Sequence, residues 1–218
     1  MLYELRQLTR HVQALQAQQT RTRNQRHAIL NSQVPVKEVI SSLDAMIKMT
    51  EKTIDKLKES CIKLVEKDPQ LSKSVAHIES IKGMGTWAAV ILIAETDGFT
   101  MIESAKQLKS YAGYDVVENQ SGKRAGKTKI SKKGNARIRR ALLFPAFNVV
   151  RYNQGGFADF YERLFGRGKP KMQVYVAIQR KLLVLAWTLC KKGEDFDPSY
   201  HLKEKEKDRT PKSPAQDT

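Results

Sequence analysis

The chain has 218 residues, and 39 Lys or Arg against 23 Asp or Glu give it a formal net charge of +16. Its hydrophobic content of 40% is enough for a folded core, while Cys61 and Cys190 are too few for a disulfide framework. No apolar run reaches the roughly 18 residues that span a bilayer, and no signal peptide is recognised. These features exclude secreted, membrane and disulfide-stapled proteins. We expect a cytoplasmic protein whose first partner to consider is a polyanion such as nucleic acid.

Residues 1–66 are predicted to form an antiparallel coiled-coil helical hairpin. Mostly apolar positions in residues 40–64 alternate spacings of three and four, which is the pattern of an a/d seam. Residues 5–29 keep this spacing, and Pro35 separates the two stretches because proline is costly inside a helix. Three seam positions of residues 5–29 are polar: Gln19, Thr22 and Arg26. They either weaken the hairpin or meet a second copy, so we predict a homo-oligomer formed through the coiled coil.

Residues 67–200 are predicted to form a compact helical domain, and residues 201–218 a disordered charged tail. Apolar spacing predicts helices over residues 70–81, 86–95, 104–112, 135–152, 156–165 and 171–191. Ser104 is expected to cap its helix, and Pro145 to kink or break the helix that contains it. Residues 115–130 combine β-branched residues with a glycine-rich centre, which favours a loop or a small hairpin. The predicted fold class is therefore all-α.

Residues 78–89 have the form of a helix-hairpin-helix. Gly83 and Gly85 permit a tight turn, Met84 packs into the helix pair, and free N–H groups begin the next helix. Such N–H groups bind a phosphate without reading a base. The three residues Gly83 to Gly85 are therefore predicted to hold a nucleic-acid backbone, and the alternative is an ordinary glycine turn between two core helices.

A second candidate site is the run from Ser121 to Arg140, which holds nine basic residues and no acidic one. Interleaved glycines and hydroxyls allow close approach to phosphate oxygens. The predicted DNA-binding residues are Lys123, Arg124, Lys127, Lys129, Lys132, Lys133, Arg137 and Arg140. The alternative is a solvated charged face. A nucleotide-binding P-loop is disfavoured, because the glycines of this run are one residue too close and no apolar strand precedes them.

Ser121 lies at the head of this run. A serine hydroxyl attacks a phosphate only when its proton is removed and the phosphate charge is neutralised. Five cations of the run are suited to that neutralisation: Arg124, Lys127, Lys132, Arg137 and Arg140. On composition alone, a turn residue is the better interpretation of Ser121.

Several blocks between Ile78 and Lys192 occur in the same order as in a known family, and they favour a functional role for Ser121 over a turn residue. They include Gln120-Ser121-Gly122 and residues 81–89, 93–95, 104–108, 111–113, 130–135, 137–142 and 160–164. Together they resemble the C-terminal domain of the Piv/MooV-type transposases of the insertion-sequence-110/116/902 group. The resemblance implies a DNA recombinase guided by a structured RNA. It also implies that the serine matching Ser121 attacks a DNA phosphodiester and forms a phosphoserine link.

The same resemblance implies a second catalytic element, an N-terminal RuvC-type nuclease domain in which four acidic residues hold a divalent metal. Upstream of Asp44 the only acidic residues are Glu4 and Glu38. We therefore expect no cofactor in this chain and a divalent metal in a domain missing from it, so that the chain is a fragment, a truncated gene product or an excised piece. Residues 112–115 also depart from the family, which usually has an apolar residue and a proline there.

The prediction is thus the DNA-binding, serine-bearing half of an insertion-sequence transposase, located in the bacterial cytoplasm in association with the nucleoid. DNA, a structured guide RNA and a second copy are its expected partners, and a complete strand-transfer site is not expected to form in this chain alone. Two other interpretations stay open. One is a non-catalytic helix-hairpin-helix nucleic-acid-binding module, and the other is a coiled-coil scaffold whose positive charge is incidental.

Overall fold

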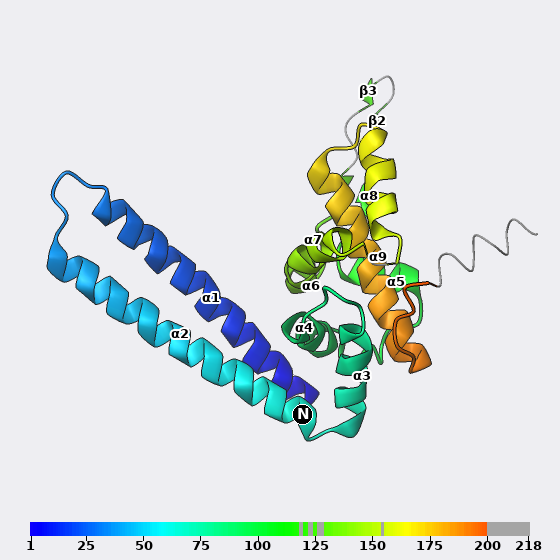
Figure 1. The fold of residues 1–218 in the computed structure, drawn as a ribbon, viewed down its shortest axis with the longest axis horizontal. Coiled ribbons are helices and arrows are strands. Elements are labelled where there is room, and N and C mark those ends of the chain that lie inside the picture. Colours follow the sequence, from blue (N-terminus) through cyan, green and yellow to red (C-terminus); the bar gives the residue numbers. More distant parts are fainter. Residues whose placement is uncertain (118–119, 122–123, 126–128, 154, 200–218) are drawn as a thin grey trace, which may run out of the picture. The chain divides into compact units, whose positions relative to one another are not determined.

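The computed structural model describes residues 1–117, 120–121, 124–125, 129–153 and 155–199, and helices dominate it (Figure 1). The helices are α1 (Leu2–Leu30), α2 (Lys37–Glu66), α3 (Pro69–Glu79), α4 (Thr86–Thr96), α5 (Ala105–Tyr111), α6 (Ala136–Ala141), α7 (Leu143–Arg151), α8 (Phe157–Gly166) and α9 (Lys171–Lys192). The predicted all-α fold class is confirmed. Within the described ranges, no helix is both long enough and apolar enough to cross a membrane.

The chain divides into two compact units. The first consists of Met1–Val75 and Ala89–Ile102, and the second of Ala76–Ala88 and the residues from Glu103 onward. This division interleaves the chain, because α3 and α4 each contribute residues to both units. The boundaries expected from the sequence, after residues 66 and 200, stay predictions.

In the first unit, α1 and α2 lie antiparallel side by side (Figure 1). Every seam position expected from the spacing is buried or half-buried in the structure, including Leu5, Val12, Leu43, Ile54 and Cys61, which are fully buried or nearly so. The burial follows from the alternating three-and-four spacing, which keeps one stripe of each helix toward the other.

The three polar seam residues find partners within this chain. The Gln19 amide donates to the Ile47 carbonyl at 3.4 Å, the Thr22 hydroxyl donates to the carbonyl one turn earlier, and Arg26 pairs with Asp44. Their polar groups therefore need no second copy for satisfaction. Self-association through this hairpin stays a prediction.

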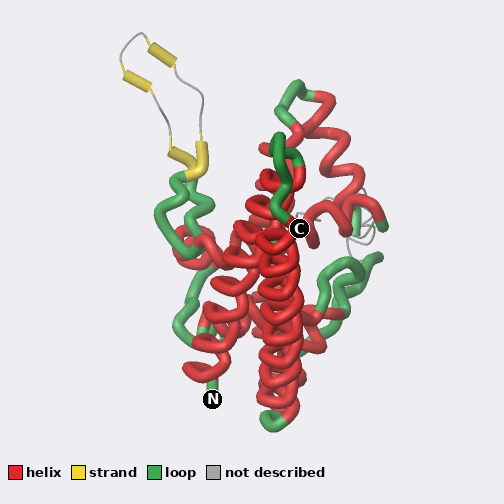
Figure 2. The backbone as a smooth tube through the Cα atoms, turned by 90° about the vertical axis from the view of Figure 1, so that its left-hand side faces the viewer, coloured by secondary structure: helices red, strands yellow, loops and turns green. Residues whose placement is uncertain are grey.

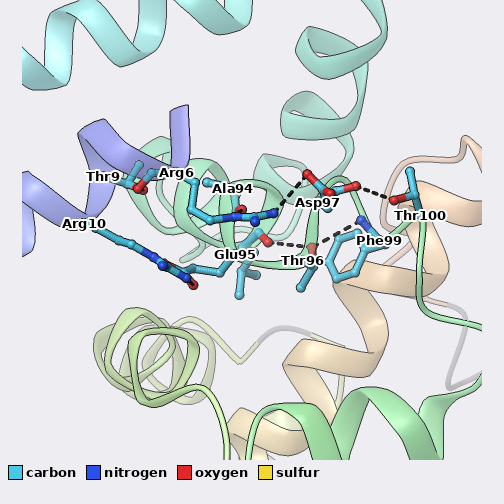
Figure 3. Close-up of polar contacts among 10 residues, drawn as sticks. Arg6, Thr9, Arg10, Ala94, Glu95, Thr96, Asp97, Phe99 and Thr100 are labelled. Atoms are coloured by element: carbon cyan, nitrogen blue, oxygen red, sulfur yellow. Dashed lines mark hydrogen bonds and ion pairs between the residues drawn. The ribbon is translucent and has the colours of Figure 1, made fainter. Parts of the chain in front are cut away.

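The first unit also buries α4 from Ala89 to Thr96, although Glu95 lies in this stretch. Two arginines on α1, Arg6 and Arg10, contact the C-terminal end of α4 (Figure 3). Arg10 makes two 2.9 Å hydrogen bonds to the Glu95 carboxylate, whose side chain is fully buried. Arg6 donates to the Ala94 carbonyl at 2.7 Å and pairs with Asp97 at 3.0 Å. A buried carboxylate needs such pairing, so these contacts fix α4 against α1.

In the second unit, α9 carries the core stripe, and Val174, Ile178, Leu182, Leu183 and Ala186 are all buried. Helices α7 and α8 pack on α9 and on each other. Five of the six helices predicted for residues 67–200 have observed ends within two residues of the prediction.

The remaining prediction is a helix over residues 135–152 that Pro145 kinks or breaks, and the structure shows such a break. The structure breaks it at Leu142 into α6 and α7, and Pro145 lies in the first turn of α7. The expected disruption by Pro145 therefore falls just ahead of the proline. The first turn of a helix has no intrahelical partners for its N–H groups, so a proline there loses no hydrogen bond.

Residues 116–130 contain two antiparallel strand pairs, drawn in yellow in Figure 2. β1 (Val116–Val117) pairs with β4 (Lys129–Ile130), so that Val116 faces Ile130. β2 (Gln120–Ser121) pairs with β3 (Arg124–Ala125). Of the two alternatives expected for this segment, a loop or a small hairpin, the observed strand pairs agree with the hairpin. We call these two pairs the ribbon.

Candidate functional site

Ser121, the predicted nucleophile, lies in β2 of the ribbon. Its partner across the strand pair is Arg124, one of the predicted phosphate-neutralising cations. The ribbon backbone therefore brings these two positions directly opposite each other. The side chains of both residues lie outside the described part of the chain, as do the predicted sites Lys123 and Lys127.

The foot of the ribbon, residues 111–117 and 129–135, is tied by backbone hydrogen bonds between its two legs. The amide of Ser131 donates to the Asp115 carbonyl at 2.7 Å, and the amide of Lys132 donates to the Gly113 carbonyl at 3.1 Å. Below them, the amide of Asn135 donates to the Tyr111 carbonyl at 2.7 Å. These bonds continue the β1–β4 pairing down to the helices that carry the ribbon.

Arg139 on α6 braces this foot. Its guanidinium donates to the carbonyls of Ala112 at 2.7 Å, Lys132 at 3.3 Å and Gly134 at 3.4 Å. A guanidinium has five donors in a rigid plane, which suits it to holding several carbonyls at once. In the sequence Arg139 is one of nine similar cations, and nothing there distinguishes it from its neighbours as a structural residue.

Two glycines allow the legs to approach. Gly113 has φ +71° and Gly134 has φ +149°, both in the range that favours glycine. A Cβ at Gly134 would lie 2.5 Å from the Tyr111 carbonyl oxygen and 2.6 Å from the Gly113 nitrogen. A Cβ at Gly113 would lie 2.7 Å from the Arg139 guanidinium. Any larger residue at either position would push the legs apart.

Tyr114 anchors the foot in the core. The residue is fully buried, and its hydroxyl donates to the Gln179 side-chain oxygen on α9 at 2.9 Å. Burial raises the pKa of the Tyr114 hydroxyl, so it stays protonated and keeps its role as a donor. Where the sequence departs from the family pattern after Gly113, Tyr114 thus enters the core. The sequence offered no signal for the Tyr114–Gln179 pair.

The other predicted cations of the run lie on the exposed surface of the second unit. They are Lys129, Lys132, Lys133, Arg137 and Arg140. Lys132 has φ +55°, which is strained for a residue with a side chain, and the hydrogen bonds of the foot hold it there. Asn135 caps α6 by accepting from the amide of Arg137 at 3.0 Å.

The other predicted phosphate site, Gly83 to Gly85, forms the turn between α3 and α4. Met84 is buried, and Gly83 has φ +110°. The Gly83 carbonyl accepts a hydrogen bond from the side-chain amide of Asn148 at 3.4 Å. A hydroxyl–carboxylate hydrogen bond lies at the start of α4, from Thr86 to Glu79. A phosphate arriving at this helix end would meet that carboxylate, which counts against strong binding there. The phosphate-binding role of the turn stays a prediction.

The described residues include no group of three or more His, Cys, Asp or Glu placed to hold a metal ion. The four-carboxylate metal site implied by the resemblance is therefore not formed by them.

These features define a class: a basic, mostly helical protein whose strand ribbon carries a serine within a run of cations in the sequence. Residues 75–162 match the family described as "Transposase IS116/IS110/IS902 family". This stretch of the chain thus carries the domain of this transposase family, and the match covers the turn at Gly83, α4, the ribbon and α5 to α7, with most of α8.

Three relatives agree with this assignment. The chain is 32% identical over 165 residues to the pilin gene-inverting protein of Moraxella bovis, and this alignment covers 75% of this chain and 51% of the relative. Its identity to the protein of the same name from Moraxella lacunata is 30% over 164 residues, with the same coverage. An insertion element IS110 protein of Streptomyces coelicolor is 23% identical over 120 residues, which is 55% of this chain and 29% of that protein. The chain thus spans about half the length of the Moraxella relatives.

Proposed function

We propose that this chain is the DNA-gripping and serine-bearing part of a transposase, with Ser121 as the nucleophile. One observation carries the proposal. Ser121 lies in the ribbon directly opposite Arg124, above a foot that Tyr114, Arg139 and two glycines tie to the helical core. A firmly held ribbon favours catalysis, because a nucleophile must be presented within a narrow range of positions.

The proposed step is an exchange of one phosphodiester for another. The Ser121 oxygen attacks the phosphorus of a DNA backbone phosphate, and a serine–phosphorus bond forms. The bond from phosphorus to one of the two sugar oxygens breaks, and that oxygen leaves as a hydroxyl after taking up a proton, which balances the proton lost by serine. Cations of the basic run neutralise the charge that builds on the phosphate oxygens.

The partners follow as part of the same proposal. DNA is the substrate, while a structured guide RNA and a second copy of the chain complete the assembly. A divalent metal, if the assembly uses one, would be held by residues other than those described here. The second candidate function is a non-catalytic nucleic-acid-binding module. It is favoured by the exposed cations of the run.

Salt dependence tests what the two functions share. Affinity for DNA should fall by about 0.7–0.9 log units per log unit of salt for each phosphate contacted, in either case. Absence of this dependence would instead support a scaffold whose charge is incidental.

Covalent trapping separates the two functions. The chain is incubated with a nicked suicide DNA substrate, with a metal-binding domain of the family supplied in trans, and adducts are resolved on a denaturing gel. We expect Ser121→Ala to abolish the adduct while DNA affinity stays within about twofold of the unmodified chain, because a hydroxyl contributes little to phosphate binding by cations. Ser131→Ala is the matched control and should keep both the covalent adduct and the DNA affinity. An adduct that persists in Ser121→Ala shows that the nucleophile is elsewhere, and no adduct from the unmodified chain supports the binding module.

A further inference from the structure

A groove of about 1000 Å³ opens in the second unit beside the foot of the ribbon. One wall is formed by α5 and by the β1 and β4 strands, and the other by α8 and α9. Its surface is mainly apolar, with contributions from Phe160, Leu164, Val176, Ala177 and Val184. Half-buried apolar side chains in a large groove are typical of a binding site.

The charges around this apolar surface are nearly all of one sign. Six cations line the groove: Lys109, Lys129, Lys132, Lys169, Arg180 and Lys181. Among the described residues, Asp197 is the only acidic residue that lines it. The cations come from both walls, and the Lys181 ammonium lies 4.3 Å from the centre of the Phe160 ring. An occupant must therefore be anionic along its edges and apolar between them.

Unpaired nucleotides meet both requirements. In a duplex the base faces are stacked inside, so a duplex offers phosphates and sugars but nothing for an apolar floor. A single strand exposes its base faces, and proteins that hold such strands combine a cationic groove with surfaces on which bases lie. The groove also has few uncharged polar side chains with which to read base edges. The Tyr114 hydroxyl already donates to Gln179 and the Thr188 hydroxyl to the Val184 carbonyl, so Gln173 is the main such group among the described lining residues. Its binding would thus be independent of sequence.

We propose that this groove binds unpaired nucleotides of a DNA strand, with phosphates on the rim cations and bases on the apolar floor. DNA is favoured over RNA because the floor offers little to satisfy a 2′-hydroxyl. The inference goes beyond the proposed function, since it does not depend on the chemistry of Ser121. It adds a place for the strand next to the ribbon, because Val116, Lys129 and Ile130 of the ribbon form part of the groove wall.

The test places a carboxylate in the groove at an exposed position. Met172 lines the groove, is 55% exposed and lies in the first turn of α9, where an acidic side chain is favourable to the helix. Met172→Glu should therefore fold. Met46→Glu is the matched control, since Met46 is 47% exposed on α2 in the first unit. Both variants make the same change of charge.

Binding is measured by fluorescence anisotropy with a labelled oligothymidine of about 12 nucleotides, which lies within the usual site size, and with a duplex of equal length. We expect Met172→Glu to weaken single-strand binding by about five- to tenfold through repulsion of the phosphates, and duplex binding by less than about twofold. Met46→Glu should change both by less than about twofold.

Three results would overturn the inference. An equal loss for single strand and duplex would mean that the groove acts only through its charge. No loss for the single strand would leave the groove to another occupant, such as an acidic amphipathic protein segment. Tighter binding of an oligouridine of the same length would assign it to RNA. Ser121→Ala should keep single-strand binding, so failure of the trapping experiment and failure of this one are distinguishable.

Discussion

Replacing Arg139 by alanine tests the foot of the ribbon without touching the predicted nucleophile. The strongest of its three hydrogen bonds is the 2.7 Å contact to the partly buried Ala112 carbonyl, whereas the contacts to Lys132 and Gly134 are longer and exposed. A hydrogen bond from a charged donor contributes about 1.5–3 kcal/mol, and the exposed contacts add little. We therefore expect Arg139→Ala to lower the free energy of unfolding of the second unit by about 2 kcal/mol.

The assay is urea unfolding followed by tryptophan fluorescence. Both tryptophans, Trp87 and Trp187, belong to the second unit, so their emission reports the unit that contains Arg139. Arg140→Ala is the matched control, because Arg140 is an exposed neighbour on the same helix and its removal changes the charge equally. Its effect should stay within about 0.5 kcal/mol.

Hydrogen exchange localises the effect. The amides of Lys132 and Asn135 close the foot, and they should exchange faster in Arg139→Ala but not in Arg140→Ala. Equal destabilisation by the two substitutions, or unchanged exchange at these amides, would refute the bracing role and leave Arg139 as one more surface cation.

Two further predictions concern the turn at Gly83 and the buried carboxylate. Gly83→Ala should lower the free energy of unfolding in urea by about 2 kcal/mol, because φ at Gly83 is +110° and the new Cβ would lie 3.0 Å from the Asn148 side chain. Gly85→Ala is the control. It has open space around its Cβ and should change stability by less than about 1 kcal/mol. Equal effects would mean that the close packing of this turn is unimportant. Arg10→Ala should cost about 3 kcal/mol, measured by far-ultraviolet circular dichroism, because it takes from the buried Glu95 its arginine partner. Arg26→Ala, which breaks an exposed ion pair on the same helix, should cost at most about 1 kcal/mol, and a larger loss there than for Arg10→Ala would contradict this argument.

The features that the sequence predicts are those determined by residues close together in the chain. The Ser104 cap is confirmed, since its hydroxyl accepts from the Gln107 amide at 3.2 Å, three residues away. The seam of α1 and α2 follows from spacing alone. Pro145 predicts a disruption, but its exact place depends on which turn of the helix the proline occupies, and the packing of α7 on α9 decides that.

The features that the sequence does not predict depend on contacts between distant residues. Tyr114 and Gln179 are 65 residues apart, and Arg10 and Glu95 are 85 apart. Each pair is a polar contact to a buried side chain, and nothing in the local sequence pattern indicates which residues form it. The groove is a similar case, because its cations come from α5, the ribbon and its foot, the segment between α8 and α9, and α9 itself.

The nine cations of the run from Ser121 to Arg140 look alike in the sequence, yet the structure distinguishes those whose side chains it describes. The Arg139 guanidinium donates to three backbone carbonyls. Lys129 and Lys132 line the groove, whereas Lys133 and Arg140 lie exposed on the surface. Net charge alone therefore overstates how much of the run is available to a phosphate. If the ribbon presents a nucleophile, its rigidity must come from residues that make no contact with DNA, since two short strand pairs cannot hold it alone. Arg139 and Tyr114 are placed to supply that rigidity, so their loss should disturb any covalent chemistry at Ser121 before it disturbs affinity for DNA.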